Sequence, residues 1–257
     1  MHSLMTATHG LAAAHGLAAT HGDLGHRVSR LWHHAFTTQP LPPEWLVLGS
    51  GALALAAVVS PRVWPLARNV VTIVHEGGHA LAALATGRRL AGVRLYRNTA
   101  GVTYSAGRPD GPGIVLTAAA GYPAPSLLGL GAAALLAIGH LTGMLLLSLL
   151  LLAGLAIAIR NAYGMLAVLV TGAAIAAVCL LASPEVQAGF GYTMTWFLLL
   201  GGIRPVIELQ RERRRDRTGS DADQLARLTP VPGTVWVVFF GLFALAAAAV
   251  SADWLVR

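Results

Sequence analysis

The sequence has few charged residues and no lysine. Only 11% of its 257 residues are charged, whereas soluble domains carry about 25%. Its 18 basic residues are all arginines, and 55% of the chain is hydrophobic. This composition excludes an ordinary soluble domain. Long apolar runs separated by short polar breaks are typical of a helical membrane protein with several spans.

Other features that the chain lacks exclude further classes. Its single cysteine, Cys179, lies in an apolar run, which excludes a disulfide framework and a cysteine-based zinc site. The N-terminus lacks the basic region and continuous apolar core of a cleaved signal peptide. It is instead rich in His, Gly and Ala, so we predict a disordered tail over residues 1–40 and one membrane domain over residues 41–257.

Apolar segments predict an all-α polytopic fold with six to seven transmembrane helices. The lower number applies if the first segment, which is short for a span, does not cross. We expect the third segment to be broken at GYPAPS, residues 121–126, and the sixth to be interrupted at Gly201-Gly202 and Pro205. The seven predicted segments are Trp45–Ser60, Arg68–Thr86, Gly113–Ile138, Leu141–Ile159, Tyr163–Ala182, Gly189–Leu209 and Thr234–Val250.

A stretch of different character follows the second segment. In LAGVRLYRNTAGVTYSAGRPDG, Val93, Leu95, Val102 and Tyr104 alternate with polar residues, and residues 98–101 offer a turn. This pattern predicts a small β-hairpin.

Most arginines lie in loops beside apolar segments. If the loop after the second segment is cytoplasmic, the presumed outer loops hold only Arg62, Arg68 and the terminal Arg257. This bias predicts a cytoplasmic N-terminus in a multi-pass protein of the cell membrane. It also indicates that the partner of these arginines is the surface of the lipid bilayer. No aromatic or fold signature of nucleic-acid binding accompanies them, so we expect no nucleic-acid partner.

The second segment carries the motif HEGGH. His75 and His79 are four residues apart, so on a helix both imidazoles can reach one metal ion. Glu76 between them could then act as general base on a water that the metal polarises. The alternative is a hydrogen-bonded packing cluster in a non-enzyme. Ionisable groups in an apolar helix are costly unless they have partners, which favours a functional site.

The apolar HEGGHA helix, the basic hairpin after it and the broken GYPAPS helix together resemble the site-2 protease group of intramembrane zinc metalloproteases. More narrowly, the chain resembles a compact, peptidase-like bacterial branch of that group. The resemblance implies that Zn²⁺ is bound by His75, His79 and a distant aspartate, with Glu76 activating water. It also implies a membrane-protein or peptide substrate and a bacterial plasma membrane. GYPAPS is similar to the group's Gly-Pro-x-x-Asn element, with Ser126 or Tyr122 in place of the asparagine.

The third metal ligand departs from the group's pattern, because the chain has no Asp-Gly pair in a late membrane helix. We favour Asp221, in the string SDADQLARL, which resembles the SDA string of the compact branch. Asp223, Glu208, His140 or a further water are the alternatives. Ser220 and Asp223 also form a capping box, which would give acidic residues here a structural role.

The sequence therefore predicts a membrane-embedded zinc endopeptidase that hydrolyses peptide bonds within or next to the bilayer. The alternative is a catalytically inactive metal-binding scaffold. A metal carrier is disfavoured, because spans other than the second hold almost no acidic residues or histidines. Nothing in the sequence indicates the oligomeric state.

Overall fold

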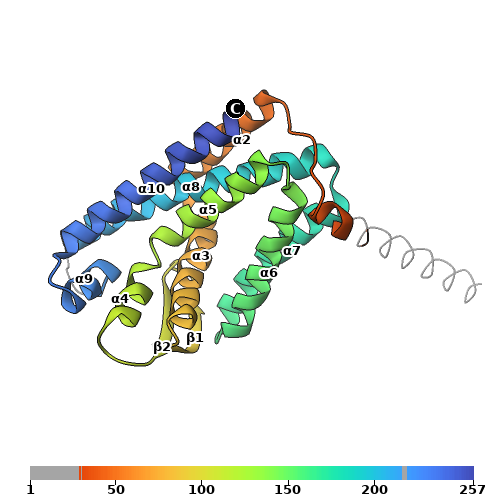
Figure 1. Cartoon of the computed structure of the whole chain (residues 1–257). Coiled ribbons are helices and arrows are strands. Elements are labelled where there is room, and N and C mark those ends of the chain that lie inside the picture. The colour runs from red at the N-terminus through yellow and green to blue at the C-terminus, as the bar shows by residue number, and fades with distance from the viewer. Residues whose placement is uncertain (1–28, 30, 216–218) are drawn as a thin grey trace, which may run out of the picture.

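The computed structural model describes residues 29, 31–215 and 219–257, and these form a mostly helical protein with one small sheet (Figure 1). The sheet is an antiparallel hairpin of β1 and β2. The elements, in chain order, are α2 (Glu44–Val59), α3 (Trp64–Ala85), β1 (Arg89–Leu95), β2 (Gly101–Ala106), α4 (Pro112–Ala119), α5 (Pro123–Ala137), α6 (Leu141–Ala158), α7 (Ala162–Leu181), α8 (Pro184–Arg213), α9 (Asp221–Leu228) and α10 (Gly233–Val256).

Three helices, α6, α7 and α10, are long and apolar enough to cross a membrane. Two further pairs pass the same criteria only together, and each is sharply bent. The angle is 102° between α2 and α3 and 70° between α4 and α5. The described part of the chain thus offers three to five candidate spans. The mostly helical architecture with several candidate spans and a hairpin is confirmed, and the count of six to seven spans stays a prediction.

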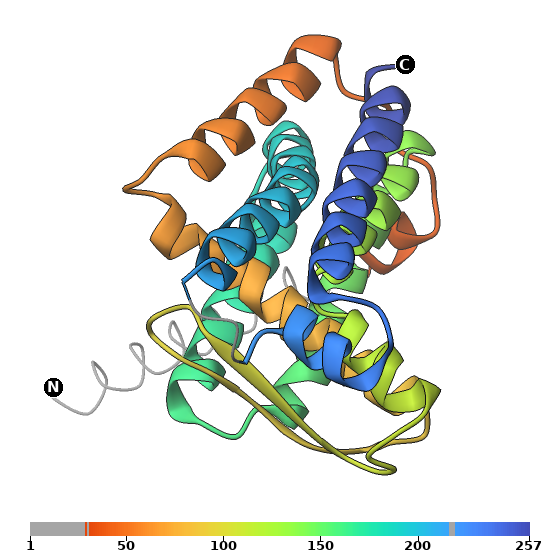
Figure 2. The same cartoon turned by 90° about the vertical axis from the view of Figure 1, so that its left-hand side faces the viewer.

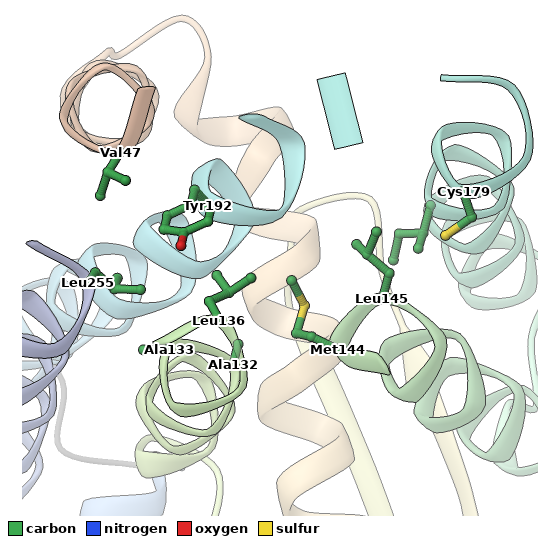
Figure 3. Close-up of a cluster of buried hydrophobic side chains, with 10 residues drawn as sticks. Val47, Ala132, Ala133, Leu136, Met144, Leu145, Cys179, Tyr192 and Leu255 are labelled. Carbon is green, nitrogen blue, oxygen red and sulfur yellow. The ribbon is translucent and has the colours of Figure 1, made fainter. Parts of the chain in front are cut away.

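A buried apolar cluster joins six of the helices at one end of the bundle (Figure 3). Val47 of α2, Leu136 of α5, Met144 of α6, Cys179 of α7 and Tyr192 of α8 all contribute side chains. Apolar contact between helices in lipid is driven by close packing rather than by exclusion of water. The cluster therefore fixes how the long helices are arranged.

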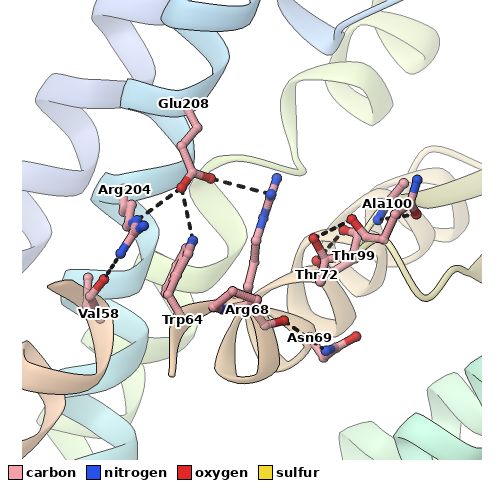
Figure 4. Close-up of polar contacts among 11 residues, drawn as sticks. Val58, Trp64, Arg68, Asn69, Thr72, Thr99, Ala100, Arg204 and Glu208 are labelled. Carbon is pink, nitrogen blue, oxygen red and sulfur yellow. Dashed lines mark hydrogen bonds and ion pairs between the residues drawn. The ribbon is translucent and has the colours of Figure 1, made fainter. Parts of the chain in front are cut away.

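The bend between α2 and α3 is held against α8 by polar contacts (Figure 4). Glu208 accepts hydrogen bonds from the Trp64 indole at 2.9 Å and from Arg204 at 3.0 Å, and it pairs with Arg68 at 3.5 Å. Arg204 also stacks over the Trp64 ring and donates to the carbonyl of Val58. The end of α2 and the start of α3 are thus both attached to α8.

The predicted interruption of the sixth segment is wrong, because α8 runs unbroken from Pro184 to Arg213 with Pro205 inside it. The glycines serve helix packing instead. A Cβ at Gly202 would collide with Ser126 of α5, and one at Gly201 would lie 3.1 Å from Val71 of α3. Membrane helices tolerate Pro and Gly where neighbouring helices approach this closely.

The predicted break at residues 121–126 is confirmed as the bend between α4 and α5. The hairpin is also confirmed, but the apolar residues of its two strands lie on opposite faces. Val93 and Leu95 are buried, whereas Val102 and Tyr104 are exposed. The register accounts for this difference, because Val93 lies opposite Thr103. The face of β2 that turns inward is therefore polar.

Most of the predicted tail, residues 1–28 and residue 30, lies outside the described residues. Near its predicted end, Gln39 contacts the turn between α5 and α6. Its side-chain amide donates to Thr142 Oγ1 at 2.8 Å, and its backbone amide donates to the carbonyl of Gly139 at 2.8 Å.

Candidate metal centre

The two histidines of α3 lie on one face of the helix, with their Nε2 atoms 3.1 Å apart. His79 is buried, and its Nδ1 lies 2.7 Å from the carbonyl oxygen of Thr117 in α4. A carbonyl can only accept, so this contact indicates a proton on Nδ1 and leaves the lone pair of Nε2 available. The ring of His75 packs edge-on against Tyr122, with 4.8 Å between centroids.

Asp221, the first residue of α9, completes a cluster with these histidines. Its Oδ2 lies 3.2 Å from Nε2 of His75 and 3.2 Å from Nε2 of His79. The helix is placed by Ala222 and Leu225, which are buried against α4, α8 and α10. Figure 2 shows this short helix beside the lower end of α10 and next to α4. Segments far apart in the sequence thus bring three potential ligand atoms together.

This cluster fits a metal ion. Tetrahedral zinc ligands at about 2.0–2.2 Å from the ion would lie roughly 3.3–3.6 Å from one another, slightly more than the separations of 3.1 and 3.2 Å found here. The Oδ2 atom of Asp221 is buried and makes no hydrogen bond within the described residues. Acceptor atoms that converge in this way repel one another unless a cation lies between them. The group could therefore hold a metal ion.

Asp223 lies two residues further on but belongs to a different interaction. Its Oδ1 pairs with Nε of Arg213 at 2.9 Å, and its backbone amide donates to Ser220 Oγ at 3.2 Å. Burial opposes its ionisation, but the hydrogen bonds from Ser220 and Arg213 outweigh it and hold the pKa of Asp223 below its usual range. Ser220 thus caps α9, and Asp223 ties the helix to the end of α8.

The other alternative ligands also lie elsewhere. Glu208 is engaged at the bend between α2 and α3, as described above. His140 precedes α6, where its Nδ1 lies 3.0 Å from the carbonyl oxygen of Ile138. Of the two residues considered in place of the asparagine, Tyr122 contacts His75, whereas Ser126 is buried and faces Gly202 of α8.

Glu76 is covered by the hairpin and is only 4% exposed. Thr103 of β2 donates a hydrogen bond of 2.6 Å from its Oγ1 to Oε2 of Glu76. Gly101 lies against Oε1, where a Cβ would collide with the carboxylate. Thr103 and Gly101 were not predicted from the sequence as residues of the site. The small and polar residues at alternate positions of β2 could have indicated that one face of this strand contacts a polar group.

Two glycines leave room at the cluster. A Cβ at Gly121 would lie 2.6 Å from Nε2 of His75 and would collide with His79. Gly78 faces the same bend, where a Cβ would lie 2.8 Å from the carbonyl oxygen of Ala120. The bend between α4 and α5 can therefore approach α3 only because both positions lack a side chain.

Comparison with known proteins agrees with this geometry. No curated protein and no solved structure shows significant similarity to the chain. The sequence profile of one family, described as Peptidase M50B-like, matches residues 48–251, a range that includes the bundle from α3 to α9 and all three residues of the cluster. The match covers most of the chain and indicates a membrane metallopeptidase. The chain belongs to the Peptidase M50B-like family.

Proposed function

We propose that the protein is a membrane-embedded zinc endopeptidase that hydrolyses peptide bonds within or next to the bilayer. The observation that carries this proposal is the convergence of His75, His79 and Asp221, with Oδ2 of Asp221 3.2 Å from both imidazoles. Family membership supports it, since peptidases of this kind are generally zinc enzymes.

The three residues of the cluster would hold the ion. Two imidazoles and one carboxylate are a ligand set that suits zinc and leaves a position for water or substrate. When bound, zinc would polarise the scissile carbonyl and lower the pKa of water. The chain itself orients the ligands, because the Thr117 carbonyl fixes the tautomer of His79 and the capped α9 fixes Asp221.

Glu76 would act as general base in this reaction. It would take a proton from the attacking water at a carboxylate oxygen and deliver it to the leaving amine. Thr103 occupies Oε2 through its hydrogen bond of 2.6 Å, so Oε1, beside Gly101, is the atom left to exchange the proton. Access of substrate to this atom requires β2 to move or to admit a chain along Gly101.

The burial of Glu76 favours a second candidate function, a metal-binding membrane scaffold without peptidase activity. A general base that is 4% exposed cannot meet a substrate without rearrangement. The two functions share the metal centre and differ only in whether Glu76 reacts.

The test compares cleavage and zinc content in the same preparations. We expect the purified full chain in liposomes to cleave a reconstituted fluorogenic single-span peptide, and Glu76→Gln to abolish cleavage while zinc content stays the same. Glu212→Gln, an exposed carboxyl change on α8, is the matched control and should retain activity. Cleavage by Glu76→Gln at the wild-type rate would refute the mechanism. Zinc binding without cleavage by the wild type would favour the scaffold.

A further inference from the structure

A second polar site lies on the outer side of the hairpin. It is an open pocket of about 570 Å³ between the hairpin and the turn that joins α6 to α7. Its lining consists of Ala91, Gly92 and Arg94 of β1, Tyr104 of β2, and Arg160 of the turn. None of these residues belongs to the candidate metal centre, so the pocket is a distinct feature of the molecule.

The backbone around this pocket is well fixed. The amide of Arg160 donates to the carbonyl of Val93 at 2.9 Å. The side chain of Asn161 both donates to and accepts from the backbone of Leu95, at 2.7 and 3.2 Å. The turn thus continues the edge of β1, and the relative positions of the strand and the helical turn are set by hydrogen bonds.

The side chain of Arg160 is held as well. Its Nη1 donates to the carbonyls of Ile157 at 2.7 Å and Ile159 at 3.0 Å. Its aliphatic part lies on Gly92, where a Cβ would collide with it. Among the described residues these contacts use only Nη1 of the guanidinium, so its remaining donors stay available to a ligand.

The pocket has strong positive charge, and the described part of the chain supplies no counter-charge to it. Neither Arg94 nor Arg160 has an acidic partner among the residues that the structure describes. The sequence contains no Asp or Glu between residues 77 and 109, or between residues 111 and 183. Two guanidinium groups beside a tyrosine hydroxyl suit the oxygens of a phosphate group, which guanidinium binds through paired hydrogen bonds.

The position of the pocket relative to the membrane indicates the source of that phosphate. α6 and α7 are both candidate spans and meet at residues 159–161. A short turn between two spans lies at the membrane surface, where lipid phosphates are found. Val102, paired with Arg94 in the hairpin, and Tyr104 are 39% and 47% exposed on the same outer face. An apolar and aromatic surface beside arginines is typical of contact with the lipid interface.

We propose that this pocket binds the phosphate of an anionic phospholipid at the end of α6 and α7. The site is independent of the metal centre and of peptidase activity. Bound lipid would supply the counter-charge for Arg94 and Arg160 and would hold the hairpin, whose other strand covers Glu76, at a fixed depth.

The experiment measures binding of a fluorescent short-chain phosphatidylglycerol to the purified full chain in neutral detergent. We expect Arg94→Gln/Arg160→Gln to raise the dissociation constant of the lipid by at least about 10-fold, which is about 1.4 kcal/mol of binding free energy. The matched control, Arg89→Gln/Arg97→Gln, removes two charges from the same hairpin outside the pocket and should change it less than about 2-fold. Equal losses in the two double variants would overturn the proposal.

Two further measurements distinguish a phospholipid from other ligands of the same pocket. Arg94→Gln alone should weaken binding at least about 3-fold. Because Arg94 forms no ion pair with the described residues, such an effect cannot be attributed to a disturbed turn. Short-chain phosphatidylcholine should compete poorly. Displacement of the probe by equimolar inorganic phosphate, by a tetraglutamate peptide or by phosphatidylcholine would each overturn the lipid assignment, in favour of free phosphate, an acidic protein segment or non-specific lipid contact respectively.

Discussion

Thr103 donates a hydrogen bond of 2.6 Å to Oε2 of Glu76 and lies 3.2 Å from the carbonyl oxygen of the same residue. A strand residue thus holds both the side chain and the backbone of the proposed base. The hairpin is therefore a structural part of the centre, because it determines the orientation of the carboxylate.

Replacement of Thr103 by Val should lower the rate of peptide cleavage on the order of 10-fold. It leaves one buried oxygen of Glu76 without its donor, which costs about 1–3 kcal/mol. Thr103→Ser keeps the hydroxyl and is the control, with near wild-type turnover. The measurement is kcat with the reconstituted peptide, alongside zinc content, which should not change. A Val variant that cleaves as fast as the Ser variant would contradict the role of this hydrogen bond.

Gly121→Ala should reduce zinc content sharply. The added Cβ would collide with His79 and lie 2.6 Å from Nε2 of His75, so one of the two imidazoles would have to move away. Gly131→Ala, on α5 with nothing within 4 Å of the added methyl, is the matched control and should keep its zinc. Zinc per protein is measured by mass spectrometry of the metal. Full occupancy in Gly121→Ala would mean that the ion lies elsewhere.

The pair of Arg213 and Asp223 should be important for both stability and metal affinity. Arg213→Gln leaves Asp223 buried without its partner, and removing one member of such a pair costs about 3–5 kcal/mol. Since Asp221 is two residues from Asp223, zinc affinity should also fall about 10- to 100-fold, as for other outer hydrogen-bond partners.

The control for this change is Arg214→Gln, which alters the exposed neighbouring residue. Its unfolding temperature in detergent and its zinc affinity should match those of the wild type. If Arg213→Gln loses stability but binds zinc normally, α9 does not depend on the pair for its position at the metal centre.

Removal of metal should destabilise the protein reversibly. A ligand that binds only the folded state stabilises it by about 4 kcal/mol at 1,000 times its dissociation constant. We therefore expect a chelator to lower the unfolding temperature of the wild type and added zinc to restore it. A His75→Ala/His79→Ala variant should show no response to either treatment. A response in that variant equal to that of the wild type would place the stabilising metal outside the cluster.

Much of the centre on α3 could be predicted because it is local. The spacing of His75 and His79 places both imidazoles on one face of any helix. Asp221 lies far along the chain, so no periodicity relates it to the histidines, and it was suggested by resemblance and by its place before the last apolar segment. The capping box could have indicated which of the two aspartates is the metal ligand. With Ser220 as N-cap, the side chain of Asp223 accepts a hydrogen bond from the Ser220 hydroxyl, whereas Asp221 is free to point away.

Features that depend on neighbouring elements were harder to predict. Gly201, Gly202 and Pro205 favour a break in an isolated helix, but α8 continues because α3 and α5 pack into the space that the glycines leave. The hairpin was predictable from its alternation and turn. Which face of β2 turns inward was not, because that depends on the pairing of Val93 with Thr103 and on contact with Glu76.

The placement of Asp221 on α9 has a consequence for biosynthesis. A ribosome makes α3, with both histidines, long before it reaches residue 221. Until α9 docks against α4, α8 and α10, a nascent chain would hold the two imidazoles without the carboxylate of Asp221, and its affinity for zinc would be low. The protein would therefore acquire its metal, and with it any capacity to cut other membrane proteins, only after α8, α9 and α10 had been made and packed.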